Sequence, residues 1–141
     1  MEIKSQFTLH KQLKLDTFDV VDLPLSKVLL MNDAQFPWLI LVPRIANISE
    51  VFQLSQEDYN QLNRESFMVG KNMMSHFNGD KLNIGSLGNL VPQLHLHHIV
   101  RYKTDIAWPS PVWGQQAPVP YNKQDVAKLL IEMKEMLLSD F

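Results

Sequence analysis

Three polar residues alternate with leucine in one short stretch of this sequence, namely Gln93, His95 and His97. In a β-strand, successive side chains point to opposite faces of the sheet, so these three would lie on one face and Leu94 and Leu96 on the other. A neutral imidazole near its pKa can act as a nucleophile, a proton shuttle or a metal ligand. We therefore expect two imidazoles to lie side by side and to contact the same ligand group.

The two histidines also have simpler interpretations. They can be surface residues, or residues satisfied by hydrogen bonds in the core. A zinc site is another alternative, but zinc needs a third protein ligand. His98 would point to the opposite face, His10 and His76 lie in other segments, and no acidic residue is near this stretch. We therefore expect no metal and no other cofactor.

Composition limits the kinds of protein that this sequence can encode. The chain has 141 residues, a formal net charge of -2 and no cysteine. This length predicts one domain, residues 1–141, with its own core. The charge provides no basic field for nucleic acid or anionic membranes, and the lack of cysteine excludes disulfides and thiolate chemistry. Without a membrane-spanning apolar run or a signal-peptide core, we expect a cytoplasmic protein that binds neither nucleic acid nor membrane.

Short apolar runs indicate the strands that would carry the polar residues. Residues 28–32 and 38–42 flank a tight polar turn and predict a β-hairpin. Both runs are solidly apolar, which predicts a sheet covered on one face and partly on the other. Two further strands are predicted at 82–87 and 94–102. Consecutive strands with short turns favour antiparallel pairing.

Two longer segments have the spacing of amphipathic helices. The first begins after Ser55, a good N-cap residue, and ends at Gly79, which suits the left-handed C-terminal position. The second follows Asn122, and a short helix is predicted within residues 7–15. The predicted order is strand, strand, long helix, strand, strand, extended segment and helix. This order indicates an α+β fold with helices packed on one face of the sheet.

The stretch around His95 resembles the signature of the histidine triad (HIT) superfamily, in which three histidines alternate with apolar residues. The matching run is Gln93-Leu94-His95-Leu96-His97-His98-Ile99, with Gly88-Asn89 where the family has Gly-Gln. The predicted hairpin, long helix and strand order also fit, from about residue 28 to residue 113. The resemblance implies a HIT-like antiparallel sheet with a long helix and a C-terminal helix.

The resemblance also implies a reaction. In the family, the middle histidine attacks the α-phosphorus of a nucleotide, and the position that matches it is His95. Covalent catalysis by imidazole divides one difficult displacement into two easier ones. His97 would support the site, and a backbone carbonyl near it would accept a hydrogen bond from the nucleophilic ring. Asn89 would donate an amide hydrogen to a phosphate oxygen, together with backbone amides of residues 90–93.

More distant segments would complete the ligand site. Asn83 is close to the family's second polar phosphate contact, offset by one residue. Asn32 and Asp33 end the first predicted strand where the family places a ribose-binding Asn or Asp, although turn chemistry alone explains them equally well. Trp108 and Trp113 lie in the tail that reaches the site in related proteins, and simple packing explains them at least as well.

Three departures from the family pattern affect what the site can do. Gln93 replaces the first histidine, and because an amide cannot titrate, proton donation from that position would be lost. Leu90 replaces a residue that often carries a hydroxyl group. His98 replaces an apolar residue and is expected to face solvent or an interface.

These features predict a nucleotide-binding protein that acts as a hydrolase or transferase at the α-phosphate. Its substrate would be a dinucleoside polyphosphate or a nucleoside phosphoramidate. A nucleotide-binding module with little turnover is the main alternative, because Gln93 and Leu90 remove candidate acids. A structural or interaction protein that uses the sheet edge or the tail is a third alternative. The resemblance also favours a homodimer.

Overall fold

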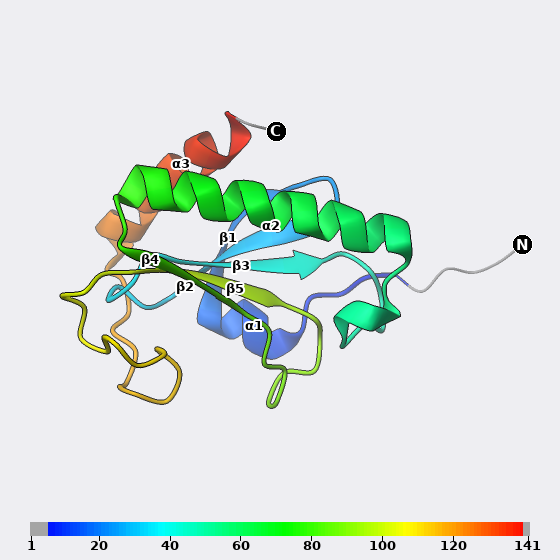
Figure 1. Cartoon of the computed structure of the whole chain (residues 1–141), viewed down its shortest axis with the longest axis horizontal. Helices are drawn as coiled ribbons and strands as arrows, with labels where there is room; N and C mark the ends of the chain where they lie inside the picture. Colours follow the sequence, from blue (N-terminus) through cyan, green and yellow to red (C-terminus); the bar gives the residue numbers. More distant parts are fainter. Residues whose placement is uncertain (1–5, 140–141) are drawn as a thin grey trace, which may run out of the picture.

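Five antiparallel strands form one sheet in the order β1-β2-β3-β5-β4. The strands are Thr17–Asp22 (β1), Ser26–Met31 (β2), Trp38–Pro43 (β3), Lys81–Gly85 (β4) and Leu96–Arg101 (β5). The helices are Lys11–Asp16 (α1), Gln56–Phe77 (α2) and Lys123–Leu138 (α3), with a short 3-10 helix at Val51–Gln53 (η1). This computed structural model describes residues 6–139 (Figure 1) and confirms the α+β fold.

The central strands β2 and β3 come from the two apolar runs expected to form a hairpin. Every residue of β3 is buried, which requires cover on both faces of the sheet. Strand β1 was not predicted, because its sequence mixes acidic and apolar residues. It pairs with β2 at the edge of the sheet, with an irregularity between Asp19 and Val21. An edge strand tolerates such polar residues because only one of its sides is paired.

Helix α2 begins as predicted, with the Ser55 hydroxyl oxygen accepting a hydrogen bond from the Asp58 N–H. Its left-handed C-terminal residue is Asn78 (φ 50°, ψ 50°), not Gly79 as expected. Asparagine reaches this conformation more readily than most residues because its short polar side chain bonds locally. Gly79 is needed for a different reason, since a Cβ there would overlap the Val100 side chain.

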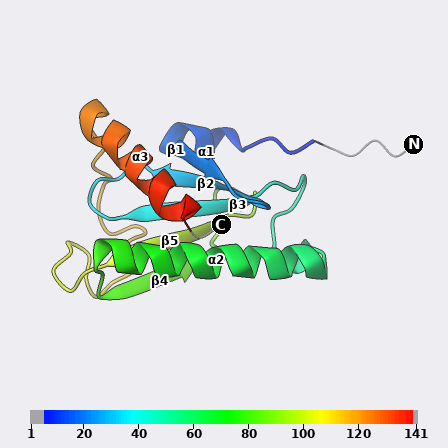
Figure 2. The ribbon, with the colours of Figure 1, turned by 90° about the horizontal axis from the view of Figure 1, so that it is seen from above.

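The two faces of the sheet are covered by different elements. Helices α2 and α3 lie on one face, whereas α1 lies on the other (Figure 1, Figure 2). The expectation that the helices share one face is therefore wrong for α1. Strands β2 and β3 are apolar on both faces, and each face needs apolar cover. This explains why α1 lies on the face opposite α2 and α3. No helix within residues 6–139 is long and apolar enough to cross a membrane.

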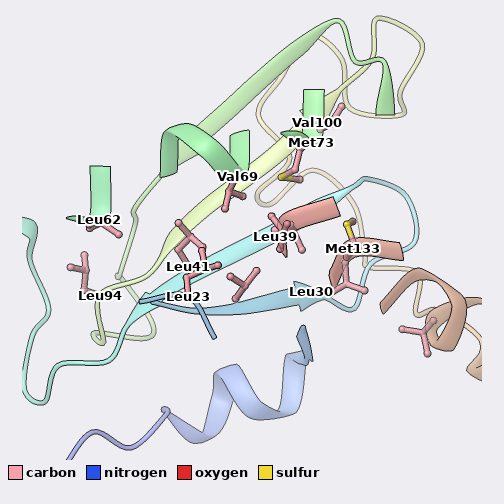
Figure 3. Packing of buried hydrophobic residues seen from close by; sticks show 13 residues of the cluster. Leu23, Leu30, Leu39, Leu41, Leu62, Val69, Met73, Leu94, Val100 and Met133 are labelled. Atoms are coloured by element: carbon pink, nitrogen blue, oxygen red, sulfur yellow. The ribbon is translucent and has the colours of Figure 1, made fainter. Parts of the chain in front are cut away.

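Each covered face has its own core. Beneath α2 and α3, Figure 3 shows leucines of the sheet packed against helix residues such as Val69, Met73 and Met133. The opposite core joins the N-terminal segment to the sheet and to residues 102–113. Its buried members include Leu9, Leu13, Phe36, Trp38, Ile40, Ile99, Ala107 and Val112. The predicted histidine site lies on this second face.

Candidate active site

A cavity of about 720 Å³ opens on the sheet face that α1 covers. Its walls come from the end of α1, the β2–β3 turn, the loop before β5, β5 itself and the proline-rich segment after it. This volume is within the range of small-molecule pockets. The lining includes six of the eight residues predicted for the site, namely Asn32, Asp33, Asn89, His95, His97 and Trp113. Gln93 and Asn83 do not line it.

His95 lies just before β5, with its ring buried at the cavity wall. Its Nδ1 is 2.7 Å from the carbonyl oxygen of Gln93. Because a carbonyl oxygen only accepts, Nδ1 carries the proton, and Nε2 of the neutral ring keeps its lone pair. The acceptor is thus a carbonyl two residues before the ring, not one near His97 as expected. The ring presents an unprotonated nitrogen to a ligand.

His97 is held by Trp38, a residue that the sequence analysis did not identify. The buried Trp38 Nε1 donates a hydrogen bond to His97 Nδ1 at 3.0 Å. Since an indole N–H can only donate, His97 must carry its own hydrogen on Nε2. Burial, together with the nearby imidazoles of His95 and His98, lowers the pKa of His97 from 6.5 to about 3. His97 is therefore a neutral hydrogen-bond donor at physiological pH.

Strand register brings the rings of Trp38 and His97 together. Ile40 of β3 pairs with His97 of β5, and Trp38 pairs with Ile99. Directly paired residues share a sheet face, as do residues two positions apart on a strand. Trp38 and His97 are therefore diagonal neighbours on the cavity face, within hydrogen-bonding reach.

Trp113 closes the other side of the His97 ring. The ring centroids of Trp113 and His97 are 5.3 Å apart, and those of His95 and His97 are 4.9 Å apart. Gly85 pairs with His97 from β4, and a Cβ on this glycine would lie 3.2 Å from the Trp113 ring. The missing side chain thus leaves room for the indole. The buried Trp113 Nε1 has no acceptor among the described residues, so the wall contains an unused donor.

The turn after β2 contributes two polar residues to the cavity. Asn32 Oδ1 accepts a hydrogen bond from the Tyr121 N–H at 2.9 Å. Asp33 Oδ1 accepts hydrogen bonds from the backbone N–H groups of Gln35 and Val119. Both side chains therefore fasten the turn to the segment before α3. They also line the cavity, so the same two side chains can stabilise the turn and contact a ligand.

Gln93 lies before β5 and holds the N-terminal segment. Its Oε1 accepts a hydrogen bond from the His10 N–H at 2.8 Å, and its Nε2 donates to the Thr8 carbonyl at 2.9 Å. The carboxamide thus acts like a peptide group that pairs with an extended backbone. The expectation that Gln93 shares a sheet face with the two histidines does not hold, because the strand begins only at Leu96.

Asn83 and His98 also lie away from the cavity. Asn83 Oδ1 accepts a hydrogen bond from Arg101 Nη1 at 2.9 Å, beside the buried ion pair of Arg101 with Asp105. His98 was expected at the surface but is completely buried, with Nε2 2.7 Å from Ser66 Oγ of α2. Burial lowers the pKa of His98 from 6.5 to about 4. The Ser66 hydroxyl gives the buried imidazole a hydrogen-bond partner, which explains how the core accommodates a histidine at this position.

The zinc alternative finds no third ligand in the part of the chain that the structure describes. Within residues 6–139, no three His, Cys, Asp or Glu side chains are placed to hold one metal ion. Nδ1 of His95 and Nδ1 of His97 are already engaged by the Gln93 carbonyl and the Trp38 indole. The geometry instead favours ligand binding through one imidazole nitrogen with a lone pair and one imidazole N–H.

Known proteins resemble this chain in sequence and in structure. Residues 12–104 match the family model described as HIT domain. A histidine triad protein from Marinobacter aquaeolei VT8 is 47% identical with a TM-score of 0.93, over 96% of this chain and 98% of that chain. Those from Bradyrhizobium japonicum and Sinorhizobium meliloti 1021 are 43% and 40% identical, with TM-scores of 0.91 and 0.89. They cover 94% and 92% of this chain, and 99% and 96% of their own chains. No curated protein sequence matches this chain significantly.

Proposed function

Because the chain belongs to the HIT domain family, we propose that it binds a nucleotide and cleaves the bond between the α-phosphorus and its leaving group. The observation that carries the proposal is the hydrogen bond from His95 Nδ1 to the Gln93 carbonyl. This bond selects the tautomer with a lone pair on Nε2, as a nucleophile requires. The substrate class is a dinucleoside polyphosphate or a nucleoside phosphoramidate, which makes the protein a nucleotidyl hydrolase or transferase.

Two displacements complete the proposed reaction. His95 Nε2 attacks the phosphorus, a P–N bond forms, and the leaving group departs with the electron pair of the bond that breaks. Water or another acceptor then attacks the same phosphorus, the P–N bond breaks, and His95 recovers its lone pair while the acceptor's proton passes to solvent. The His97 Nε2–H and the Asn89 amide donate to the non-bridging oxygens, where negative charge develops.

The nucleoside is proposed to lie at the end of the cavity formed by α1 and β2. Asn32 and Asp33 line this end, and a carboxylate can accept hydrogen bonds from two neighbouring ribose hydroxyls. Trp113 supplies an aromatic wall beside His97. These contacts would hold the α-phosphorus near His95 before attack, which is the main benefit of ordered binding.

Trapping the covalent intermediate tests the proposal. The protein is mixed with adenosine 5′-phosphoramidate, quenched within the first turnover and examined by intact mass spectrometry. We expect an adenylyl group on the wild type and none on His95→Ala, whose turnover falls about a thousandfold or more. His76→Ala, a change in α2 outside the cavity lining, serves as the control. Equal product formation by His95→Ala and the wild type would contradict the mechanism.

A nucleotide-binding module with little turnover is a second candidate. The specific observation in its favour is that Gln93 is engaged by backbone groups of residues 8–10 and supplies no acid to the cavity. Calorimetry with AMP and GMP, together with turnover assays, separates the two candidates. Binding without His95-dependent turnover would favour the module, whereas no binding at millimolar nucleotide would contradict both candidates.

We also propose that the protein forms a homodimer through α2 and β4. Strand β4 ends the sheet within the described residues, and Ile84 on it is 50% exposed, while Phe67 on α2 is 66% exposed. Leu82, on the same side of β4 as Ile84, packs against Gly70 of α2. Two-fold pairing would cover this apolar edge. Sedimentation should show a dimer that Phe67→Lys weakens, and a wild-type monomer at working concentration would contradict the proposal.

A further inference from the structure

Asp16 places a carboxylate in the cavity that the proposed roles leave unused. It is the last residue of α1 and lines the cavity. Its Oδ2 accepts a hydrogen bond from Gln12 Nε2 at 2.9 Å, which orients the group. In the part of the chain that the structure describes, no lysine, arginine or histidine forms an ion pair with it. An anionic acceptor is therefore available to a ligand.

The sheet determines how far Asp16 lies from the histidines. The strands run in the order β1-β2-β3-β5, so Asp16 at the start of β1 and His97 on β5 are three strand spacings apart, or about 14 Å across the sheet. Met31 of β2 and Trp38 of β3 line the cavity between them. The Asn32 N–H donates to the Asp16 carbonyl at 3.0 Å, which fixes the position of Asp16 beside β2. A nucleotide whose phosphate lies beside His97 can thus reach Asp16 only with the far edge of its base.

Apolar side chains near Asp16 suit the faces of a base. Leu15 lines the cavity although it is 73% exposed, and Met31 pairs with Thr17, the residue after Asp16. A purine has two apolar faces and a polar edge, so its faces can cover these side chains while its edge meets the carboxylate. Because burial of apolar surface favours binding, Leu15 and Met31 would hold any purine, and Asp16 would distinguish between purines.

The edge that meets Asp16 must supply donors, because a carboxylate can only accept hydrogen bonds. Asp33, the other carboxylate of the lining, already accepts from the N–H groups of Gln35 and Val119. Guanine offers two adjacent donors, N1–H and the 2-amino group, which match two carboxylate oxygens. Hypoxanthine lacks the amino group, and adenine places a ring-nitrogen lone pair next to its single amino group. Guanine is thus the best match among these purines.

Resting on the function proposed above, we propose that Asp16 makes the site selective for guanine nucleotides. The carboxylate accepts hydrogen bonds from guanine N1–H and from the 2-amino group, and Leu15 and Met31 contact the faces of the base. Asp16 is exposed in the free protein, so water competes for the same oxygens and limits the preference to about tenfold.

Calorimetry with GMP, IMP and AMP tests this selection on the full chain. The three nucleotides share the ribose and the phosphate, so differences in Kd report the base alone. We expect GMP to bind about tenfold more tightly than AMP, because only guanine pairs both of its donors with the charged acceptor. IMP keeps N1–H without the amino group and should fall between them.

A substitution that keeps the shape of the side chain assigns the preference to Asp16. In Asp16→Asn, the ratio of the AMP Kd to the GMP Kd should fall toward one. The new amide can accept from N1–H and donate to the 2-carbonyl of xanthine, so binding of XMP relative to GMP should improve about tenfold. Asp58→Asn, at an exposed carboxylate in the first turn of α2 and outside the cavity lining, is the control and should change neither ratio.

The outcomes separate this inference from the proposed function. Equal affinity for GMP and AMP, or an unchanged ratio in Asp16→Asn, would overturn the selection, while an adenylyl group on His95 would still support the function. Failure of all three nucleotides to bind at millimolar concentration would refute the function, and the selection with it.

Discussion

Trp38 determines what His97 can do, since its N–H occupies Nδ1 and opposes protonation there. Trp38→Phe keeps an aromatic ring but removes this donor. We expect the pKa of His97 to rise from about 3 but to stay below 6.5, because Nδ1 can then take a proton while the ring remains buried. His97 should titrate in NMR spectra, and kcat/KM at pH 7 should fall about tenfold as the ring loses one orienting hydrogen bond.

The control for this substitution is Trp108→Phe. The Trp108 indole packs over the Arg101 guanidinium with 5.7 Å between centres and does not line the cavity, so His97 should be unaffected. An unchanged NMR titration of His97 in Trp38→Phe would show that the indole does not set its protonation.

At the residue scale, the sequence predicts which side chains lie together only where the signal is local. His95 and His97 are two positions apart, so their proximity follows from any extended backbone. Trp38 is 59 positions from His97, and no local pattern specifies the register between β3 and β5 that joins them. The role of Gln93 could also not be predicted from the sequence, because the backbone groups that it binds lie more than 80 positions away.

At the scale of elements, Gln93 connects the loop before β5 to the segment that leads into α1. That helix ends in Leu15 and Asp16, which line the cavity. Gln93→Ala removes two hydrogen bonds, each worth about 1 kcal/mol. We expect amide exchange at His10 to accelerate about tenfold and KM for nucleotide substrates to rise, with a smaller change in kcat.

Gln56→Ala removes an exposed side-chain hydrogen bond to Asn60 on α2 and serves as the control for Gln93→Ala. A large loss of kcat with unchanged exchange at His10 would contradict the positioning role of Gln93. That result would indicate that the amide acts on the reaction itself.

The predicted elements match the structure where the apolar pattern was strong, either as a continuous run or at helical spacing. The hairpin strands, α2 after Ser55 and α3 after Asn122 all appear close to their expected positions. Strand β1 was missed because half of its six residues are Asp or Thr, and its conformation depends on pairing with β2. The start of β5 was placed two residues early for a related reason, since residues before Leu96 have no partner strand.

At the scale of the whole molecule, two adjacent histidines of β5 lie on opposite faces of one sheet. His97 contacts the cavity and His98 contacts α2, and both rings are buried. Burial lowers the pKa of His97 to about 3 and that of His98 to about 4. The native protein therefore keeps two neutral imidazoles that the unfolded chain would protonate below pH 6.5.

This difference makes stability depend on pH in a defined direction. Because folding lowers both pKa values, the unfolded state binds more protons than the native state below pH 6.5. The contribution of these two histidines to stability is therefore complete above pH 6.5 and is lost as the pH falls toward 4. Each histidine contributes a slope of about 1.4 kcal/mol per pH unit, or about 3 kcal/mol for His98 over that range. His98→Asn cannot titrate, so urea unfolding from pH 8 to pH 4 should show a slope smaller by one proton. Ser66→Ala keeps the imidazole, so it should lower stability at every pH and leave the slope of stability against pH unchanged. If stability depends on pH equally in the wild type and in His98→Asn, His98 is not held neutral by the fold.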